Sequence, residues 1–211
     1  MGVKIKICGI TNEEDAVWAV NYGAHYIGLN FHKESPRKVS PEQAAKIVKK
    51  VPPFIPCIGV FVEQSVDQIL KIIDKTGLMG VQLHGEHTPE DCRAISEKME
   101  VTLIRSFRVA EEADLDAIAP FKGACSHILL DAKVDGVPGG TGQTFPWELA
   151  RRAKSFGLPI FLAGGLTPEN VAQAIEEVQP FAVDVASGVE RLPKRKDLDK
   201  LKKFINEAKN A

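Results

Sequence analysis

The sequence lacks any pair of cysteines at the spacing of a metal site or a redox motif. Its four cysteines are scattered over 211 residues, at Cys8, Cys57, Cys92 and Cys125. Because no Cys-x-x-Cys occurs, neither a structural zinc site nor a disulfide framework is indicated. The cysteine content therefore fits a protein of a reducing compartment.

Long apolar runs and an excess of either charge are also missing. No apolar run reaches the ~18 residues that a membrane-spanning helix needs, and the N-terminus shows no signal-peptide pattern. The 27 Lys and Arg against 28 Asp and Glu leave a net charge of -1. Such a balance provides no basic field for nucleic acid or anionic lipid. We therefore expect a cytoplasmic protein with no nucleic-acid partner and no membrane partner.

The composition that is present is that of a folded domain. Hydrophobic residues make up 44% of the chain and charged residues 26%, which is typical of globular proteins. At this length, about 70% of the surface of the unfolded chain can be buried in one core. We expect a single domain over residues 1–211.

A unit of one strand and one helix repeats along the chain. Residues 3–8 alternate apolar and polar side chains, which predicts a strand, and the helix that follows can be capped by Thr11 or Asn12 and ended by Gly23. The pattern recurs, with strands expected near residues 25–31, 56–62, 79–84, 101–107, 127–131, 159–163 and 181–185. Three helix starts place a hydroxyl cap before a proline, at Ser40-Pro41-Glu42, Thr88-Pro89-Glu90 and Thr167-Pro168-Glu169.

Eight such units, at a period of about 25 residues, predict a single closed (β/α)8 barrel, the TIM barrel. The alternative is a doubly wound open sheet, which usually has fewer strands. Its dinucleotide-binding form also needs Gly-x-Gly-x-x-Gly after the first strand, where this chain has only Cys8-Gly9-Ile10. In a barrel, catalytic groups come from the carboxyl ends of the strands and the loops after them.

Alternation along the strands predicts which side chains face the barrel axis. The apolar residues expected to face the helices are Val3, Ile5, Ile7, Val81, Leu83, Val183 and Val185. The polar residues expected to face the axis or to end a strand are Lys6, Gln82, His84, Asp131 and Asp184. Core packing does not require so polar an axis, so we expect some of these groups, including His84 and Asp184, to contact a ligand.

Cys8 and Asp131 are a candidate base and acid. They end strands one and six, which are three apart around an eight-stranded ring, so the two side chains can face each other across the mouth. A thiol with a pKa near ~8.5 is a useful base only if that pKa is lowered, and an aspartic acid with a pKa near ~3.9 is a useful acid only if it is raised. The alternative, that Cys8 is only a small buried apolar residue, stays open.

Glycines after the last two strands predict a phosphate site. Gly164 and Gly165 follow strand seven, and Ser187 and Gly188 follow strand eight, in the two loops where such barrels commonly bind phosphate. Backbone N–H groups there would bind the anion, unless these glycines only form tight turns. We expect the two loops on the arc of the mouth opposite Cys8 and Asp131.

Three other loops carry residues that can bind a ligand: a glycine cluster, an arginine and a pair of histidines. The cluster at residues 139–142 lacks the Lys and Ser/Thr of a Walker motif, so it is either a loop that closes over a phosphorylated substrate or a plain connection. Arg37, in Ser35-Pro36-Arg37, suits a carboxylate or phosphate, or is a solvated charge. His84 and His87 lack the helical spacing of a metal site, and no metal is predicted.

Several of these segments together resemble the phosphoribosylanthranilate isomerase family. The resemblance runs from Lys4 to about Asp197. Its segments are Lys6-Ile7-Cys8-Gly9-Ile10-Thr11, Ser35-Pro36-Arg37, Val81-Gln82-Leu83-His84-Gly85, Leu129-Leu130-Asp131, Gly139-Gly140-Thr141-Gly142, Ala163-Gly164-Gly165-Leu166 and residues 184–190. The cysteine segment and the Ser-Pro-Arg segment in series are specific to that family, whereas the glycine pairs occur in many phosphate-binding barrels.

The resemblance implies a cofactor-free and metal-free Amadori rearrangement in tryptophan biosynthesis. It implies Asp131 as the general acid, Cys8 as the general base and Arg37 as the residue that binds the anthranilate carboxylate. The phosphate of the small-molecule substrate would bind at the loops after strands seven and eight.

This sequence departs from the family pattern at two places. Ala186 replaces a serine that is usual near the end of strand eight, which removes a hydroxyl from the expected phosphate site. The usual Pro-Gly turn is replaced by Pro193-Lys194, which changes the loop before Lys196 and Asp197.

Two other functions remain as alternatives. A lyase or synthase on the same kind of barrel, such as indole-glycerol-phosphate synthase, would need catalytic lysines at several strand mouths, whereas Lys4 and Lys6 lie lower in strand one. A non-catalytic barrel that binds a phosphosugar is the third possibility. The sequence leaves a monomer and a homodimer equally open.

Overall fold

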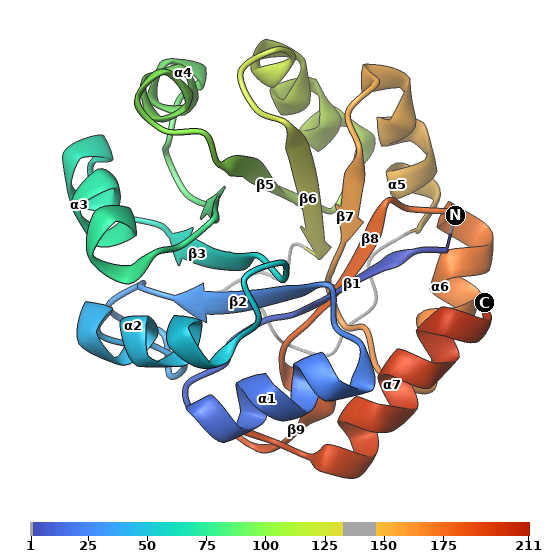
Figure 1. Cartoon of the computed structure of the whole chain (residues 1–211). Coiled ribbons are helices and arrows are strands. Elements are labelled where there is room, and N and C mark those ends of the chain that lie inside the picture. Colours follow the sequence, from blue (N-terminus) through green and yellow to red (C-terminus); the bar gives the residue numbers. More distant parts are fainter. Residues whose placement is uncertain (1, 133–146) are drawn as a thin grey trace.

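The computed structural model describes residues 2–132 and 147–211, which build a closed barrel of eight parallel strands surrounded by helices (Figure 1). The strands follow one another around the barrel in chain order, and β1 closes it by pairing with β8. Their bounds are β1 Lys4–Ile7, β2 Tyr26–Asn30, β3 Cys57–Phe61, β4 Gly80–Leu83, β5 Thr102–Val109, β6 His127–Ala132, β7 Ile160–Leu162 and β8 Ala182–Val185. The predicted (β/α)8 TIM barrel is confirmed.

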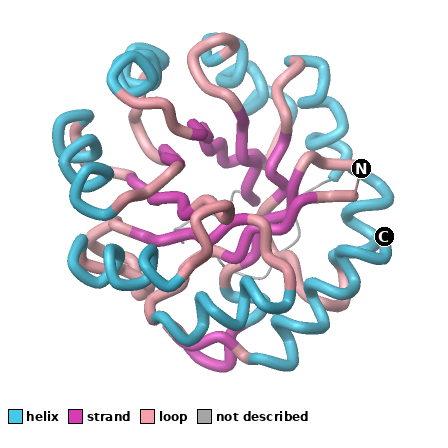
Figure 2. The backbone as a smooth tube through the Cα atoms, viewed as in Figure 1, coloured by secondary structure: helices cyan, strands magenta, loops and turns pink. Residues whose placement is uncertain are grey.

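Helices form a ring outside the strands (Figure 2). The α-helices are α1 Glu13–Tyr22, α2 Pro41–Lys50, α3 Val66–Thr76, α4 Pro89–Lys98, α5 Trp147–Ala153, α6 Val171–Val178 and α7 Leu198–Asn210. Shorter-pitched 3-10 segments are η1 Glu112–Phe121, η2 Lys154–Phe156 and η3 Ser187–Val189. Segment η1 takes the place of an α-helix after β5, and Pro120 inside it has no N–H to donate to a helical hydrogen bond.

Side-chain caps set the ends of several helices as predicted. The Asn12 side chain accepts a hydrogen bond from the backbone of the first turn of α1, and Gly23 ends that helix with a φ of 111°. Ser40 and Thr88 cap α2 and α4, each of which carries a proline in its first turn. These caps bind N–H groups that would otherwise have no partner at the helix starts.

The helix start predicted at Thr167-Pro168-Glu169 is wrong. Helix α6 begins only at Val171, and residues 168–170 form a turn. The Asn170 side chain accepts from the N–H of Thr167 at 2.8 Å and donates to the carbonyl of Gly165 at 3.0 Å. The Thr167 hydroxyl accepts from the N–H of Glu169 at 3.2 Å within this turn, and the asparagine fixes the turn to the loop after β7.

Two apolar layers lie on the two sides of the barrel wall. The layer between strands and helices includes the residues predicted to face the helices: Ile5, Ile7, Val81, Leu83, Val183 and Val185, with Val3 packed against it. The cluster inside the barrel contains Ile58, Ile104, Leu129, Phe161, Ala163 and Ala182. The predicted alternation is thereby confirmed.

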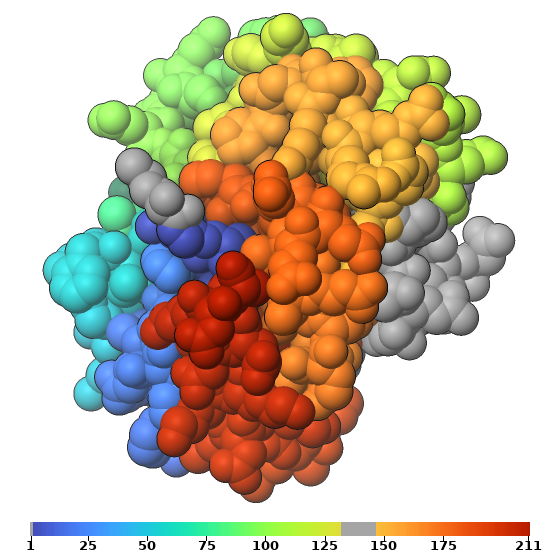
Figure 3. Space-filling model, turned by 90° about the vertical axis from the view of Figure 1, so that its right-hand side faces the viewer, coloured from blue at the N-terminus to red at the C-terminus, as the bar shows by residue number. Residues whose placement is uncertain are grey.

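A short hairpin separates β8 from the last helix. Strands β9 (Glu190–Leu192) and β10 (Arg195–Lys196) pair antiparallel. The backbone N–H of Lys196 donates to the Asp15 side chain at 3.0 Å, which fixes the hairpin to α1. Helix α7 then packs against α1 and α6, and Figure 3 shows it in red between them on the surface.

One segment singled out in the sequence falls outside the described residues, and one expectation concerns the helices within them. The glycine cluster at residues 139–142 lies outside them. Within the part of the chain that the structure describes, no helix has the length and apolar character needed to span a membrane.

Candidate active site

One cavity of about 480 Å³ lies at the carboxyl ends of the strands, and residues on or directly after all eight strands line it. Five of the sequence-predicted site residues contribute to its wall: Cys8, Arg37, His84, Asp131 and Asp184. Cys8 follows β1 and Asp131 lies near the end of β6, so residues far apart in the sequence share one chamber. The structure thus brings the candidate base and the candidate acid to the same cavity.

A buried ion pair lies beneath the Cys8 thiol. The Lys6 ammonium donates to Asp184 Oδ1 at 2.9 Å, and the Lys6 side chain is wholly buried. Burial alone would lower the pKa of Lys6, but the neighbouring Asp184 carboxylate and Cys8 together outweigh burial and raise it. Lys6 is therefore a fixed positive charge beside the thiol.

Glycine at position 28 makes room for this arrangement. A Cβ on Gly28 would lie 2.7 Å from Cys8 Sγ and 3.1 Å from Lys6 Nζ. Those distances are shorter than van der Waals contact, so the thiol and the ammonium both use space that any side chain on β2 would fill.

Burial raises the pKa of the Cys8 thiol, although the positive charge of Lys6 acts in the opposite direction. A thiol is a useful base only with a lowered pKa, and the surroundings of Cys8 do not lower it. Desolvation of the thiolate exceeds the attraction of the neighbouring cation. The wall of the cavity therefore keeps Cys8 protonated at neutral pH until another charge enters.

His84 faces the same cavity as a neutral imidazole. Its Nε2 lies 2.7 Å from the side-chain nitrogen of Gln82. Burial, together with the charges of Lys6 and Arg105, lowers the pKa of His84 to about 3. The ring is therefore uncharged at physiological pH and can donate or accept a hydrogen bond without adding charge.

Two arginines on β5 were missed by the sequence argument. Arg105 is buried and donates to the carbonyls of Leu83 and Gly85, at 2.9 and 2.7 Å, which fixes the loop that carries His84. Arg108 is exposed at the mouth and pairs in register with Asp131 on β6. The predicted strand ended at residue 107, and extending it by one residue would have included Arg108.

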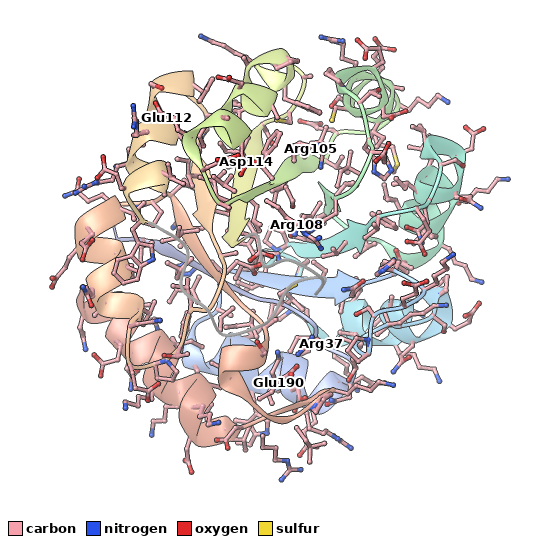
Figure 4. All side chains as sticks on the ribbon, turned by 180° about the vertical axis from the view of Figure 1, so that it is seen from behind. Arg37, Arg105, Arg108, Glu112, Asp114 and Glu190 are labelled. Atoms are coloured by element: carbon pink, nitrogen blue, oxygen red, sulfur yellow. The ribbon has the colours of Figure 1, made fainter. Side chains whose placement is uncertain are left out.

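Arg37 is held by a carboxylate that the sequence argument did not single out. Its Nε and Nη2 donate to the two oxygens of Glu190, each at 2.8 Å. Figure 4 shows the two side chains next to each other, with Arg108 nearer the centre of the barrel. The arginine also lies against Gly9, whose φ of 72° and missing side chain let it approach. Arg37 is therefore a positioned cation of the cavity wall.

The predicted phosphate loops come close together at the mouth. Gly164 and Gly165 adopt φ values of 85° and 67°, which favour glycine. A Cβ on Gly188 would overlap the carbonyl oxygen of Leu166, so the loops after β7 and β8 touch through their backbones. The cavity wall itself includes the neighbouring Ala163 and Ala186.

The expectation that these loops lie opposite Cys8 and Asp131 is wrong. Around the barrel the order is β6, β7, β8, β1. The loops after β7 and β8 therefore lie on the arc between Asp131 and Cys8. A phosphate bound there would be flanked by the candidate acid on one side and by the candidate base on the other.

The acidic and histidine side chains of the described residues are not grouped as in a metal site. Among residues 2–132 and 147–211, no group of three or more His, Cys, Asp and Glu side chains is arranged to hold a metal ion. The charged groups near the cavity instead form pairs, such as Lys6 with Asp184 and Arg37 with Glu190.

A parallel eight-stranded barrel with a polar cavity at the carboxyl ends of its strands is the architecture of TIM-barrel enzymes. Comparison with known families is more specific, because the model of the N-(5'-phosphoribosyl)anthranilate (PRA) isomerase family matches residues 5–207. The chain belongs to this family of isomerases.

Individual relatives agree with the family match. The chain is 48% identical to the N-(5'-phosphoribosyl)anthranilate isomerase of Trichlorobacter lovleyi, over 99% of each chain. It is 48% identical to that of Geobacter sulfurreducens, over 98% of each. A crystal structure of phosphoribosyl anthranilate isomerase from Thermotoga maritima is 42% identical, with a TM-score of 0.92 over 99% of this chain and 100% of that one.

One similar structure contains a bound ligand. It is a phosphoribosyl anthranilate isomerase in complex with reduced 1-(o-carboxyphenylamino)-1-deoxyribulose 5-phosphate. It is 41% identical to this chain, with a TM-score of 0.89, over 99% of this chain and 100% of that one. That ligand carries both a carboxylate and a phosphate.

Proposed function

We propose that this enzyme converts N-(5-phosphoribosyl)anthranilate to 1-(2-carboxyphenylamino)-1-deoxyribulose 5-phosphate, an Amadori rearrangement in tryptophan biosynthesis. The observation that carries the proposal is that Cys8 and Asp131, from strands β1 and β6, line one cavity together with a positioned arginine. The product is the unreduced form of the ligand in the similar complex. The reaction needs only proton transfers, so neither cofactor nor metal is part of the proposal.

Asp131 acts as the general acid in the first step. Its proton passes to the ring oxygen of the ribofuranose, the bond from that oxygen to C1' breaks, and the lone pair of the anthranilate nitrogen forms a C1'=N iminium ion. The carboxyl group must therefore be protonated when substrate is bound. Its place at the end of β6 and on the cavity wall supports this role.

Cys8 acts as the general base in the second step. Its thiolate removes the proton on C2', the electrons of that C–H bond form the C1'=C2' bond, and the iminium electrons return to nitrogen. The resulting enolamine then loses its hydroxyl proton and gains a proton at C1', which gives the ketone.

The iminium ion adds a positive charge to those of Lys6 and Lys196 near the thiol. Burial keeps the pKa of the Cys8 thiol above its ordinary value when no substrate is present. A positive charge formed one carbon from the reacting proton stabilises the thiolate and lowers that pKa. The base is then formed mainly after ring opening.

Arg37 binds the anthranilate carboxylate. Glu190 occupies its Nε and one hydrogen of Nη2. Both hydrogens of Nη1 and the second hydrogen of Nη2 remain, and together they form a second edge that matches a carboxylate. The side chain keeps 17% of its surface exposed, which supports access from the cavity.

The loops after β7 and β8 bind the phosphate through backbone N–H groups of Gly164, Gly165, Ser187 and Gly188. Their close backbone approach supports this role. Because Ala186 has no hydroxyl, the direct contacts come mainly from the backbone. Inorganic sulfate added to crystals is expected within hydrogen-bond distance of these N–H groups, and sulfate bound at Arg37 instead would contradict the assigned orientation of the substrate.

His84 and Asp184 contact the ribose part of the substrate. A neutral imidazole after β4 and, on β8, a carboxylate paired to Lys6 both line the cavity. Such groups can hydrogen-bond hydroxyl groups without changing the charge of the site.

We also propose that the enzyme works in the cytoplasm, as a monomer or a homodimer. One similar crystal structure, 41% identical and with a TM-score of 0.88, is of monomers generated from the dimeric phosphoribosylanthranilate isomerase of Thermotoga maritima. A single active site built from one chain is compatible with either state.

The test is turnover of freshly made phosphoribosylanthranilate, followed by the loss of its fluorescence, with the product identified by mass and by its keto group. We expect complete conversion to an isomer of the same mass, without added metal or cofactor. If the rearranged ketone is supplied in its place, release of carbon dioxide and water with formation of an indole would indicate a synthase instead. Binding without conversion would indicate a phosphosugar-binding barrel.

A further inference from the structure

The hairpin β9–β10 places a buried ion network behind the active site. Glu190 and Lys196 are 8% and 4% exposed, and they face each other in register across the hairpin. The Lys196 ammonium lies 3.3 Å from Glu190 Oε1. A charge pair of this kind costs desolvation free energy, and well-packed apolar residues are often as stable in its place.

The Lys196 ammonium also connects two strand ends. It donates to the backbone carbonyl of Cys8 at 2.7 Å and to that of Ala186 at 2.8 Å. With Glu190, these contacts use all three N–H bonds of the ammonium. Lys196 therefore joins the segment of the candidate base to the segment that begins the phosphate loop.

Glu190 connects the same network to the carboxylate-binding residue. Both of its oxygens accept hydrogen bonds from Arg37, which comes from the loop after β2. The two partners of this bidentate pair are separated by 153 positions in the sequence. The Glu190 carboxylate therefore binds two cations, Arg37 and Lys196, that come from different segments of the chain.

We propose that Glu190 and Lys196 are positioning residues of the active site, which hold Arg37, the Cys8 segment and the phosphate loop at fixed distances from one another. This inference rests on the proposed function. The edge of the Arg37 guanidinium that Glu190 leaves free contacts the substrate. Lys196 fixes the Cys8 segment relative to the phosphate loop, because it binds the backbone carbonyls of Cys8 and Ala186. Fixed distances between these groups hold the substrate in a reactive geometry.

Charge supports the same role. Glu190 carries one negative charge between two positive ones, so the network has an excess positive charge next to Cys8. The charge of Lys196 acts on the Cys8 thiol in the direction of a lower pKa, as Lys6 does, whereas Asp184 acts against it. Arg37 also interacts electrostatically with Cys8, so three cations lie near the thiol, and two carboxylates, Asp184 and Glu190, are paired to them.

A double-mutant cycle tests the link from Glu190 to Arg37. Glu190→Gln keeps the shape of the side chain and removes its charge, and we expect KM to rise about tenfold or more while kcat changes less. In an Arg37→Ala background the same change should have almost no further effect. The control is Glu90→Gln, which breaks an exposed Arg93–Glu90 pair with the same 2.8 Å separation and should leave KM unchanged.

The outcomes separate this inference from the proposed function. If Arg37→Ala leaves KM unchanged, the carboxylate-binding role of Arg37 fails, whatever Glu190 does. If Arg37→Ala raises KM but Glu190→Gln raises it equally in both backgrounds, the positioning role of Glu190 fails while the proposed function stands.

Lys196→Met tests the link to Cys8. Removal of a cation beside the thiol should shift the alkaline rise of kcat/KM to higher pH and lower kcat at neutral pH. A structural role alone would lower the free energy of unfolding and leave the pH profile of the folded enzyme unchanged. An unshifted profile in a folded Lys196→Met enzyme would overturn the positioning role of Lys196.

Discussion

Ala182 on β8 belongs to the apolar cluster inside the barrel, whereas Asp184, two residues further along the same strand, lines the cavity at the mouth. The distance between such positions is only about 7 Å. Two successive inward-facing residues of one strand therefore belong to different environments: the first packs in the apolar cluster, and the second lines the candidate active site.

The comparison shows what each end of the barrel provides. The apolar end removes large side chains from water, as with Phe161, which is wholly buried among aromatic rings. The polar end buries Lys6 and Lys196, whose charges must be paired and hydrogen-bonded to be tolerated. We therefore expect substitutions at the apolar end to change stability and those at the polar end to change catalysis.

Asp131→Asn should have the largest effect on catalysis. The amide cannot protonate the ring oxygen, so kcat should fall by ~10² to 10⁴, while the free energy of unfolding stays close to that of the wild type. Steady-state turnover and chemical denaturation of the same preparation check both. Asp116→Asn in η1 is the control and should keep full activity; a large loss of stability in Asp131→Asn would remove the contrast between the two ends.

Phe161→Ala should have the largest effect on stability. Removal of a buried phenyl ring that contacts Tyr26, His127 and Phe181 leaves a cavity, and we expect a loss of ~3 to 5 kcal/mol in the free energy of unfolding. The kcat of the enzyme that remains folded should change little. A loss of kcat as large as that of Asp131→Asn, in a fully folded sample, would contradict the separation of roles.

Arg37→Ala should have an intermediate effect, on binding. Loss of the charge-assisted contact to the anthranilate carboxylate should weaken binding by about 1.5 to 3 kcal/mol. An analogue without that carboxylate should bind the wild type and the variant equally, which calorimetry can measure. If both analogues lose the same affinity, Arg37 supports the wall and does not contact the carboxylate.

Lys194→Gly should have the smallest effect, on stability alone. Lys194 adopts a φ of 73° in the turn where the family usually has glycine, a region unfavourable for residues with a side chain. Glycine should raise the free energy of unfolding by ~1 kcal/mol and leave kcat and KM unchanged. A loss of stability would mean that the Lys194 side chain makes favourable contacts that outweigh the backbone strain.

Most of the fold could be predicted from local sequence, because alternation and capping act over a few residues. The inward positions of Lys6 and Asp184 follow from the apolar residues on either side of each. The helix predicted to start at Thr167 begins only at Val171, because the Asn170 side chain binds the backbone of Gly165 and Thr167 and residues 168–170 form a turn. Local capping rules do not include such side-chain bonds.

The parts of the site that could not be predicted depend on contacts between distant segments. Glu190 and Lys196 lie in a hairpin after the last barrel strand, and their contacts with Arg37 and with the Cys8 carbonyl exist only once the barrel closes. The position of the phosphate loops between Cys8 and Asp131 likewise follows from the strand order around the barrel. The raised pKa of Cys8 depends on burial, which the sequence does not state.

The most direct measurement of the central claim compares kcat for Cys8→Ala and Cys57→Ala. Cys57 is buried on β3, where burial raises its pKa to about 12, and it belongs to the apolar core. We predict that Cys8→Ala loses at least ~10² in kcat and keeps its stability and its affinity for a product analogue, whereas Cys57→Ala loses stability and keeps kcat. If Cys8→Ala turned over substrate at nearly the wild-type rate, Cys8 would not be the base, and the neutral His84 would be the next residue to test.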